Sequence, residues 1–436
     1  MASTYLSRTQ SASTTRTKFT FSCWVKIAST SGYRYIASSY ASNDNRLGFY
    51  MHTNYGFTCY ARITGVDHAL RINLAQHRDV NGWYHFVVKG DSTQSSQADR
   101  IKLYTNGVEV TDYQTDSSNN IGSSDNFAFG TTGHTFFIGN YDGTQYMYDG
   151  SMSHMHFCDG YAYDASAFGS TDSTTGEWKI NTSPNVSYGT NGFFLFKDDN
   201  AVTDRSGQGN NFTLGGGTLT KTEDNPSNVF ATFNPLDSAR NYSGTIDLKN
   251  GNTTQQNASD ASLVSSLGMN SGKWYAEFKI VNTFNTRTFG IIDISENQGY
   301  IGHASLAAAN SYAYKASAGN LWNGTTEVAS SAPGASAGDI IGIAVDLDSS
   351  TKTIKWTLNG SDLTGGTTSI NITQSNVTWG FFVRADGGQT ISANFGNGYF
   401  GTTAVASAGT NASGIGIFEY DVPTGYTALC TKGLNE

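Results

Sequence analysis

Charge, proline and cysteine are all scarce in this sequence. Only 14% of its 436 residues are charged, whereas about a quarter is usual for a soluble domain. The net charge is −9 and no run of Lys or Arg occurs, which argues against a nucleic-acid-binding surface. No stretch of about 18 apolar residues is present, and the first residues lack an apolar signal core, so we expect no membrane insertion and no secretory signal. Synthesis in a cytoplasm is therefore expected.

The four cysteines are far apart, and none belongs to a C-x-x-C pair. Cys23, Cys59 and Cys158 lie in strand-like stretches, where a free thiol behaves as a small apolar side chain; the fourth cysteine is Cys430. We expect buried, reduced thiols. A disulfide between Cys23 and Cys59 is the alternative.

Glycine and aromatic residues are, by contrast, abundant: the chain has 49 glycines, and 13% of its residues are aromatic. This composition is typical of all-β domains. Lys18–Ile27 alternates strictly, with Phe19, Phe21, Cys23 and Val25 on one face, which predicts a half-buried strand. Further short strands are predicted at residues 35–39, 47–52, 56–63, 82–89, 135–139, 146–159 and 193–197.

A hairpin is predicted in residues 100–110, RIKLYTNGVEV. The pair Asn106-Gly107 accepts the positive φ angles that two-residue hairpin loops require. Almost nothing before residue 220 has a helical pattern. Residues 1–220 are therefore predicted to form a two-sheet antiparallel sandwich of the jelly-roll kind.

A second β region begins at residue 238. Residues 272–280, GKWYAEFKI, alternate, and residues 338–360 form the best-defined hairpin of the chain, with strands at 340–347 and 353–358. Further strands are predicted at residues 289–294, 311–314, 379–384 and 390–395. No sequence repeat relates the two regions, so we predict an all-β fold of two different sandwiches in tandem, residues 1–220 and 238–436.

The segment between them, residues 221–237, contains two of the five prolines, Pro226 and Pro235. Proline lacks a backbone donor, which keeps this segment out of a central strand. Val229, Phe230 and Phe233 are nevertheless strongly apolar. We therefore predict a strap that packs between the two sandwiches through these three side chains.

Several motifs resemble known families. GWYHFVVKG followed by RIKLYTNGVEV resembles the central hairpin of laminin-G-like, concanavalin A-like domains. HFCDGYAYDASAFG (156–169), TGEWKI (175–180), YGTNGFFLFKD (188–198), DRSGQGNNFTL (204–214) and DNPSNVFATFNPLD (224–237), in this order, resemble a lectin-like module of bacteriophage virion proteins. In the second region GKWYAEF, GDIIGIAVDLD, IKWTLNG and PTGYTAL resemble a SPRY (B30.2-like) domain.

The resemblance implies a non-enzymatic virion surface protein, such as a tail fibre, spike or adhesin module that attaches to the host. Its expected partners are host-surface glycan and other virion proteins, and it is expected to be a homo-oligomer, a trimer by resemblance. It would be made in the host cytoplasm and displayed on the particle. A capsid decoration or head-fibre protein, whose main ligand is the capsid, is the alternative.

A polysaccharide hydrolase is a third alternative, because concanavalin A-like folds also include glucanases. Glycosidases normally use two carboxyl groups roughly 5–10 Å apart. Residues 1–237 contain only three glutamates, Glu109, Glu177 and Glu223, and their spacing places no two on one strand face. GASAG at 334–338 fits a serine-hydrolase pattern, but a predicted strand follows it where the mechanism needs a helix. We predict no catalytic residue.

No cofactor or metal is predicted either. His154 and His156 share one side of a predicted strand, but no third ligand accompanies them, so hydrogen-bonded strand residues are favoured over a metal site. Some laminin-G-like domains bind Ca²⁺ through loop carboxylates. The candidates here, without a clear motif, are Asp142, Asp149 and Asp204.

Recognition is the function that remains. Residues 141–150, YDGTQYMYDG, place tyrosines and aspartates in a short hairpin bounded by glycine. Tyrosine rings stack on the apolar faces of sugars, and ligands usually sit at such loops. The predicted carbohydrate-binding residues are Tyr141, Asp142, Tyr146, Tyr148 and Asp149, with Tyr33 and Tyr35. The alternative is that these aromatic side chains are strand and core residues. Trp322, in a predicted loop at 320–325, is the protein-binding candidate of the second region.

Overall fold

The computed structural model describes residues 4–28, 32–117, 120–197, 201–236, 246–257, 261–282, 287–295, 310–365, 368–385 and 388–435. Its contacts divide the chain into two compact units, Met1–Lys221 and Thr222–Glu436. Across these ranges the regular structure consists of β-strands and short 3-10 turns, which confirms the all-β prediction. No helix in the described ranges is long and apolar enough to cross a membrane.

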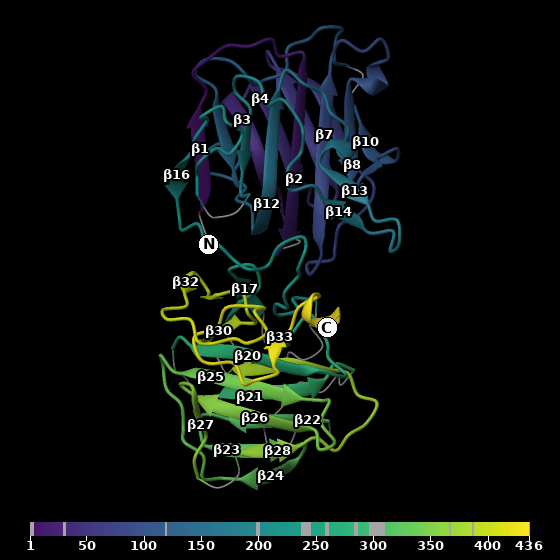
Figure 1. The fold of residues 1–436 in the computed structure, drawn as a ribbon. Coiled ribbons are helices and arrows are strands. Elements are labelled where there is room, and N and C mark those ends of the chain that lie inside the picture. The colour runs from purple at the N-terminus through teal and green to yellow at the C-terminus, as the bar shows by residue number, and fades with distance from the viewer. Residues whose placement is uncertain are drawn as a thin grey trace. The chain divides into compact units, whose positions relative to one another are not determined.

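The described residues of the first unit form a sandwich of an eight-stranded and a six-stranded antiparallel sheet, coloured purple to teal in Figure 1. The strands of the eight-stranded sheet, in spatial order, are β10 (Tyr113–Asp116), β6 (Val66–Asn73), β5 (Phe57–Ile63), β4 (Asn45–Met51), β3 (Arg34–Ser42), β11 (Thr135–Ile138), β1 (Tyr5–Thr9) and β16 (Thr213–Gly216). Those of the six-stranded sheet are β15 (Phe193–Leu195), β12 (Gly150–Asp159), β2 (Lys18–Ile27), β7 (Trp83–Asp91), β8 (Ile101–Thr105) and β9 (Val108–Glu109). A 3-10 turn, η1 (Gln97–Asp99), precedes β8.

The core of the first unit lies between its two sheets. Phe21 of β2 stacks on Phe49 of β4 with ring centroids 4.2 Å apart. Phe57 of β5 and Phe86 of β7 form a second stacked pair across the sheets, also at 4.2 Å. All four rings are fully buried, and burial of such a side chain contributes about 1.5–3 kcal/mol of stability. Because side chains alternate along a strand, the other face of each sheet points outward.

The cysteines are buried. Cys23, Cys59 and Cys158 are free thiols, and Cys430 is enclosed as well. Burial raises the pKa of Cys59 to about 12, so this thiol remains protonated and unreactive at neutral pH.

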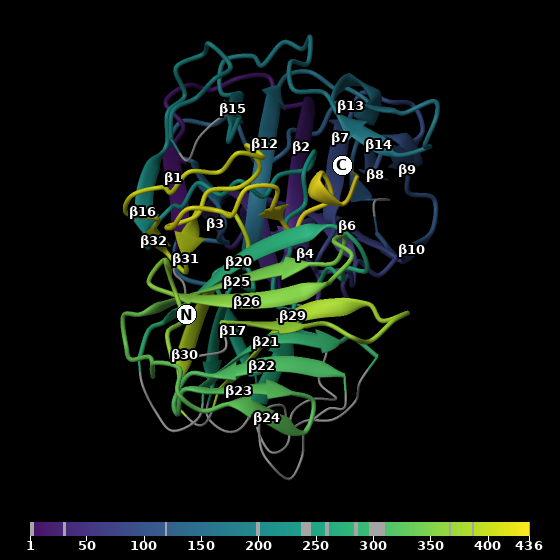
Figure 2. The same cartoon turned by 60° about the horizontal axis from the view of Figure 1, so that its bottom comes forward.

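A smaller hydrophobic layer covers the outer face of the six-stranded sheet. It includes η3 (Ala165–Ala167) and the hairpin of β13 (Gly169–Thr171) and β14 (Trp178–Ile180), which lies close to β8 in Figures 1 and 2. Trp178 donates from Nε1 to Nδ1 of His85 on β7 at 3.0 Å, and Nε2 of His85 lies 2.9 Å from Oγ of Ser22. An indole N–H can only donate, so His85 is the neutral form protonated at Nε2. Burial lowers the pKa of His85 to about 3.

The second unit is also a sandwich in its described part, with a nine-stranded and a six-stranded sheet. The path of the larger sheet is β17 (Ile246–Lys249), β18 (Thr254–Asn257), β30 (Thr390–Asn394), β20 (Lys273–Ile280), β25 (Ile340–Asp346), β26 (Thr353–Leu358) and β27 (Ser361–Asp362), with β28 (Ser369–Asn371) on β26 and β33 (Thr427–Ala428) parallel to β20. The smaller sheet contains β19 (Ala261–Val264), β29 (Trp379–Ala385), β21 (Arg287–Asp293), β22 (Ser311–Lys315), β23 (Asn320–Asn323) and β24 (Thr326–Ala329). Figure 2 shows β20, β25 and β26 side by side. A short hairpin of β31 (Tyr399–Phe400) and β32 (Thr403–Ala404) and the turn η5 (Gly433–Asn435) complete the unit.

Residues 222–236 are built into the second unit, which differs from the separate strap expected from the sequence. Phe233 is fully buried in the core of this sandwich, with its ring centroid 5.7 Å from Phe395 and 6.4 Å from Phe278 of β20. The predicted apolar packing of Phe233 therefore takes place inside the second sandwich. Residue 237 lies outside the described residues.

The other two apolar residues of the segment bind to the C-terminal end of the same unit. Val229 donates its N–H to Oγ1 of Thr431 at 3.0 Å and accepts from the N–H of Thr431 at 2.9 Å. Phe230 forms an isolated β-bridge with Cys430 and is buried in a small cluster with Tyr275. The segment thus adds backbone pairing as well as side-chain burial to the second sandwich.

A buried glutamate, Glu277, lies in the middle of β20. Its carboxylate accepts hydrogen bonds from the N–H groups of Glu419 at 2.8 Å and Tyr420 at 2.9 Å, and the Tyr275 hydroxyl lies 3.2 Å from Oε1. These bonds hold the C-terminal segment on β20. Burial raises the pKa of Glu277 from 4.5 to about 7, and the hydrogen bonds oppose this shift without cancelling it.

We expect the second unit to be more stable in mild acid than at neutral pH. The folded chain holds the Glu277 proton more tightly than the unfolded chain, so this contribution is complete below pH 4.5 and is lost as the pH rises to about 7. The free energy of unfolding should fall by roughly 2–3 kcal/mol across this window. Pulsed hydrogen exchange of the β20 amides along a urea titration measures it. Glu277→Gln should remove the slope, and an equal slope in both proteins would contradict the assignment.

Candidate functional site

Five tyrosines gather on the outer face of the eight-stranded sheet. Phe49 of β4 points into the core, so the next residue, Tyr50, points outward. Tyr35 of β3 is its cross-strand partner, and the two rings stack with centroids 4.5 Å apart at 18°. These five rings, Tyr33, Tyr35, Tyr50, Tyr141 and Tyr146, are called the tyrosine surface below, and Tyr40 and Tyr60 pack at its edge.

Tyr141 and Tyr146 come from the segment between β11 and β12. The N–H of Tyr35 donates to the carbonyl of Tyr146 at 3.0 Å, which joins this segment to the start of β3. Asp142 closes the turn, because its Oδ1 accepts from the N–H of Thr144 at 2.9 Å and from the Thr144 hydroxyl at 2.7 Å. These bonds fix both rings relative to the sheet.

The rings form one continuous cluster. The centroid of Tyr146 lies 5.5 Å from that of Tyr33 and 5.9 Å from those of Tyr35 and Tyr141. Rings attract each other at such separations. Tyr33 and Tyr146 are 36% and 42% exposed, whereas Tyr35, Tyr50 and Tyr141 are between 6% and 8% exposed. The surface therefore has two open rings above three enclosed ones.

The hydroxyls of the three enclosed rings have no hydrogen-bond partner within the described part of the chain, and none of these oxygens is sealed from solvent. Burial raises the pKa of Tyr141 to about 12 and also raises those of Tyr35 and Tyr50. The phenols therefore remain neutral at physiological pH. Each can donate one hydrogen bond and accept others, so the surface offers a ligand apolar rings and unpaired hydroxyls together.

The close packing of Tyr35 requires a glycine beneath it. Gly48 of β4 lies under this ring, and a Cβ at that position would be 2.7 Å from Cε1 of Tyr35. A larger residue would push the ring away from the sheet. Gly48 thus contributes to the tyrosine surface by leaving room for the Tyr35 ring, although it has no side chain that could contact a ligand.

Arg46 lies at one edge of the tyrosine surface. Its guanidinium carbon is 5.7 Å from the Tyr141 ring and 5.1 Å from the ring of Tyr60 on β5, and Nη2 donates to the Tyr60 hydroxyl at 3.1 Å. The Tyr60 hydroxyl in turn donates to Asp67, which is paired with Arg62 at 2.7 Å. Aromatic and polar groups therefore continue from the tyrosine surface across β4 and β5.

Four of the seven predicted carbohydrate-binding residues meet in this surface: Tyr33, Tyr35, Tyr141 and Tyr146. Tyr148 is a core residue, as the alternative reading held, and its hydroxyl donates to the carbonyl of Lys26 at 2.9 Å. The Asp142 carboxylate is engaged within its own turn, and Asp149 accepts the N–H of Ala28 through its carbonyl at 3.1 Å.

Sequence reasoning missed Tyr50, Tyr60 and Arg46. The alternation of residues 45–51, NRLGFYM, contained a signal for two of them, since Arg46 and Tyr50 fall on the face opposite Leu47 and Phe49. The pairing of Tyr50 with Tyr35 depends on the register between β3 and β4, which no local pattern specifies.

Trp322 occupies a strand and not the loop predicted for it. It lies in β23 at 8% exposure, within a buried cluster that includes Val264, Ile292 and Phe382. Its sequence, NLWN, is too short for a clear alternation. The burial of Trp322 does not support the predicted protein-binding role.

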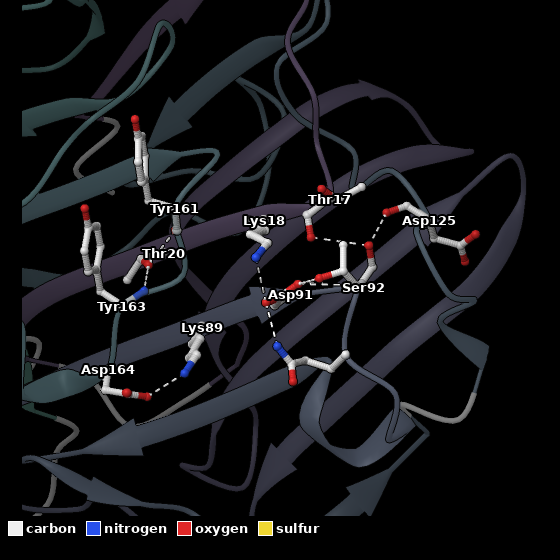
Figure 3. Close-up of polar contacts among 12 residues, drawn as sticks. Thr17, Lys18, Thr20, Lys89, Asp91, Ser92, Asp125, Tyr161, Tyr163 and Asp164 are labelled. Carbon is white, nitrogen blue, oxygen red and sulfur yellow. Dashed lines mark hydrogen bonds and ion pairs between the residues drawn. The ribbon is translucent and has the colours of Figure 1, made fainter.

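The outer face of the six-stranded sheet carries a different aromatic pair, shown in Figure 3. Oγ1 of Thr20 donates to the carbonyl of Tyr161 at 2.9 Å and accepts from the N–H of Tyr163 at 2.7 Å. The two rings point the same way and stack at 6.0 Å, near the ion pair of Lys89 with Asp164. Tyr161 is 43% exposed, close to the value for Tyr146, and among the described residues it stacks only on Tyr163, which packs against the hydrophobic layer over this sheet.

The candidate metal-binding residues are engaged within the protein. Oδ1 of Asp204 accepts from the N–H groups of Phe194 at 2.9 Å and Ser206 at 2.8 Å, which closes a loop. Nδ1 of His156 lies 2.9 Å from the Tyr188 hydroxyl, consistent with a hydrogen-bonded strand residue. Among the residues that the structure describes, no group of three or more His, Cys, Asp or Glu side chains could hold a metal ion.

A serine–histidine pair, Ser22 and His85, is structural. Both residues are fully buried, so no substrate can reach the hydroxyl. Nδ1 of His85 accepts a hydrogen bond from Trp178, whereas the Nδ1–H of a catalytic histidine donates a hydrogen bond to a carboxylate. The pair connects the β13–β14 hairpin to the sheet.

Comparison with known proteins agrees with this architecture for the first unit. Residues 2–166 match the family model described as the Concanavalin A-like lectin/glucanases superfamily. This match covers less than half of the chain and agrees with the lectin-like β-sandwich of the first unit. No curated protein matches the chain.

Solved structures with detectable similarity include SPRY domains. The SPRY domain of human HERC1 is 17% identical, with 37% of this chain and 96% of that chain covered and a TM-score of 0.28. A second human SPRY domain is 20% identical over 34% of this chain and 93% of that one, with a TM-score of 0.27. A heptameric SAP-like pentraxin from Limulus polyphemus is 17% identical over 37% of this chain and 71% of that one, with a TM-score of 0.28.

Proposed function

We propose that this chain is a non-enzymatic recognition protein and that its first unit binds carbohydrate at the tyrosine surface. One observation carries the proposal: two exposed and three enclosed tyrosines form a single cluster, and the hydroxyls of the enclosed rings have no partner among the described residues and remain open to solvent. Exposed rings can stack on the apolar face of a sugar, and unpaired phenols can bond its hydroxyls. The lectin-like family match over residues 2–166 supports the same ligand class.

We further propose that the chain is displayed on the surface of a bacteriophage particle, together with other virion proteins and as a homo-oligomer. The support is the ordered set of motifs in residues 156–237, from HFCDGYAYDASAFG to DNPSNVFATFNPLD, which resembles a virion lectin module. Immunogold labelling of intact virions with an antibody against this chain tests the location. Label on heads, with binding to isolated capsids, would favour a decoration protein over a fibre.

Replacing both open rings, Tyr33→Ala with Tyr146→Ala, should weaken binding to a host-surface polysaccharide extract by about 10- to 100-fold, because each ring supplies a hot-spot contact. The free energy of unfolding should change little, since both side chains are exposed. Titration of labelled extract measures the affinity. The same incubation should release no reducing ends if the chain is not an enzyme.

The matched control is Tyr161→Ala, which removes a ring of similar exposure from the other sheet. It should leave the affinity unchanged. Equal losses in the control and in the double variant would show that binding does not depend on the tyrosine surface. Release of reducing ends by the unmodified protein would show hydrolysis and overturn the non-enzymatic proposal.

A further inference from the structure

We infer that the tyrosine surface takes a neutral polysaccharide and binds it along the chain, not at a chain end and not through acidic groups. The inference rests on the proposed function and specifies its ligand. Three properties of the surface support it: its neutral hydroxyls, the state of the charged groups around it, and its extent across the sheet.

The polar groups that the surface offers are neutral. Tyr35, Tyr50 and Tyr141 are each more than nine-tenths buried, yet their hydroxyls lack a partner within the described residues. These hydroxyls are open to solvent, and each can donate one hydrogen bond and accept others, so they suit a ligand whose groups both donate and accept. Sugar hydroxyls do both, whereas a carboxylate or sulfate only accepts.

The charged groups at its border are of both signs and form hydrogen bonds within the protein, although Nε of Arg34 and Nε of Arg46 have no partner among the described residues. Asp142 accepts four hydrogen bonds within its own turn. Arg46 donates to the carbonyl of Asn43 at 2.8 Å and to the Tyr60 hydroxyl at 3.1 Å. Arg34 donates to the carbonyl of Tyr33 at 3.2 Å. Asp142 offsets part of the positive charge of the two arginines, so the border presents no strong charge of one sign.

The surface is broad and follows the face of a sheet. From His52, which lies 5.1 Å from Tyr33, ring contacts lead through Tyr146 and Tyr141 to Arg46 and Tyr60. Arg46 lies on β4 and Tyr60 on β5, and the other four residues lie in the segments that precede β3, follow β4 and connect β11 to β12. Their contacts are spread over these strands and segments, so successive sugar units of one chain can engage different residues. A single terminal sugar would use only a fraction of them.

Calorimetric titration of the full chain tests the ligand class. The probes are neutral polysaccharides (a β-glucan, a mannan and a galactan), an acidic polymer (alginate), and oligosaccharides of increasing length from the neutral polymer that binds. We expect binding of at least one neutral polymer, with an affinity that rises about tenfold or more from monosaccharide to longest oligosaccharide and does not fall as salt is raised.

Two variants test the hydroxyls with the rings kept. Tyr50→Phe and Tyr141→Phe should each lower the affinity for the neutral ligand roughly 3- to 10-fold. Tyr161→Phe should leave this affinity unchanged. Three results would overturn this inference but not carbohydrate binding itself. They are binding of alginate alone, loss of affinity at raised salt, and a monosaccharide that binds as tightly as its polymer. No binding to any glycan, host extract included, would overturn both. Unchanged affinity in both variants would overturn the role of the hydroxyls.

Discussion

Phe233→Ala is expected to lower the free energy of unfolding of the second unit by about 3–5 kcal/mol, the usual cost of removing a buried phenylalanine ring. Phe233 has no exposed area and contacts Phe278 and Phe395 in the core. Its backbone is also fixed, because its N–H donates to the carbonyl of Asn252 at 2.9 Å. This bond limits how far the backbone at position 233 can shift to fill the cavity. Native-state hydrogen exchange of the β20 and β30 amides measures the loss.

Leu236→Ala is the matched control for this prediction. Leu236 lies three residues further along the same segment and is 59% exposed, so its loss should change stability by no more than about 0.5 kcal/mol. Amides of β2, in the other unit, serve as an internal reference in the same experiment. Unchanged protection of β20 in the Phe233 variant would mean that the segment is a linker and not part of the second sandwich.

From the sequence, Phe230 and Phe233 are predicted to pack between the two sandwiches, whereas both are buried within the second unit. Their apolar character and the neighbouring prolines indicate a packed, irregular segment. The partners of that segment are distant in sequence: Phe233 forms a bridge with Ser265, and Phe230 forms one with Cys430. Pairing over such separations leaves no local pattern, so the boundary of the second unit at Thr222 could be found only from the structure.

Strands with a clear apolar alternation were predicted well. β2 has the predicted bounds, and the predicted hairpin of residues 340–358 is formed by β25 and β26. β6, VDHALRIN, was missed because Arg71, in its middle, is charged. The structure shows that Arg71 is buried and forms two hydrogen bonds with Asp116, at 3.0 and 3.1 Å. Burial of a paired charge is invisible to hydropathy.

The candidate site was predicted only in part, because the direction of each tyrosine side chain depends on contacts that no local pattern specifies. Tyr141 and Tyr146 stood out because they are close together in a glycine-bounded turn, and Tyr33 and Tyr35 because they are neighbours. Whether a tyrosine in that turn faces the sheet surface or the core depends on how the turn is anchored. Tyr146 is exposed, and Tyr148, two residues on, is buried with its hydroxyl on Lys26.

Gly107→Ala is expected to destabilise the first unit by roughly 2–5 kcal/mol, from two separate causes. Gly107 has a φ of +80° in the turn between β8 and β9, where an alanine costs about 1–2 kcal/mol. In addition, a Cβ would lie 2.3 Å from Cε3 of Trp178, and forcing a ring out of a packed position costs about 1–3 kcal/mol more. Hydrogen exchange of the β7 and β8 amides measures the total.

Gly176→Ala separates the two causes. Gly176 has a φ of +75°, close to that of Gly107, but a Cβ there would meet nothing within 4 Å. It should therefore show only the backbone cost of about 1–2 kcal/mol, and the difference between the two variants measures how tightly Trp178 is held. Because Trp178 donates to His85, a displaced ring would also leave Nδ1 of His85 without its donor. Equal destabilisation by both variants would mean that the β13–β14 hairpin is free to move away, and that the hydrophobic layer over the six-stranded sheet contributes little to its stability.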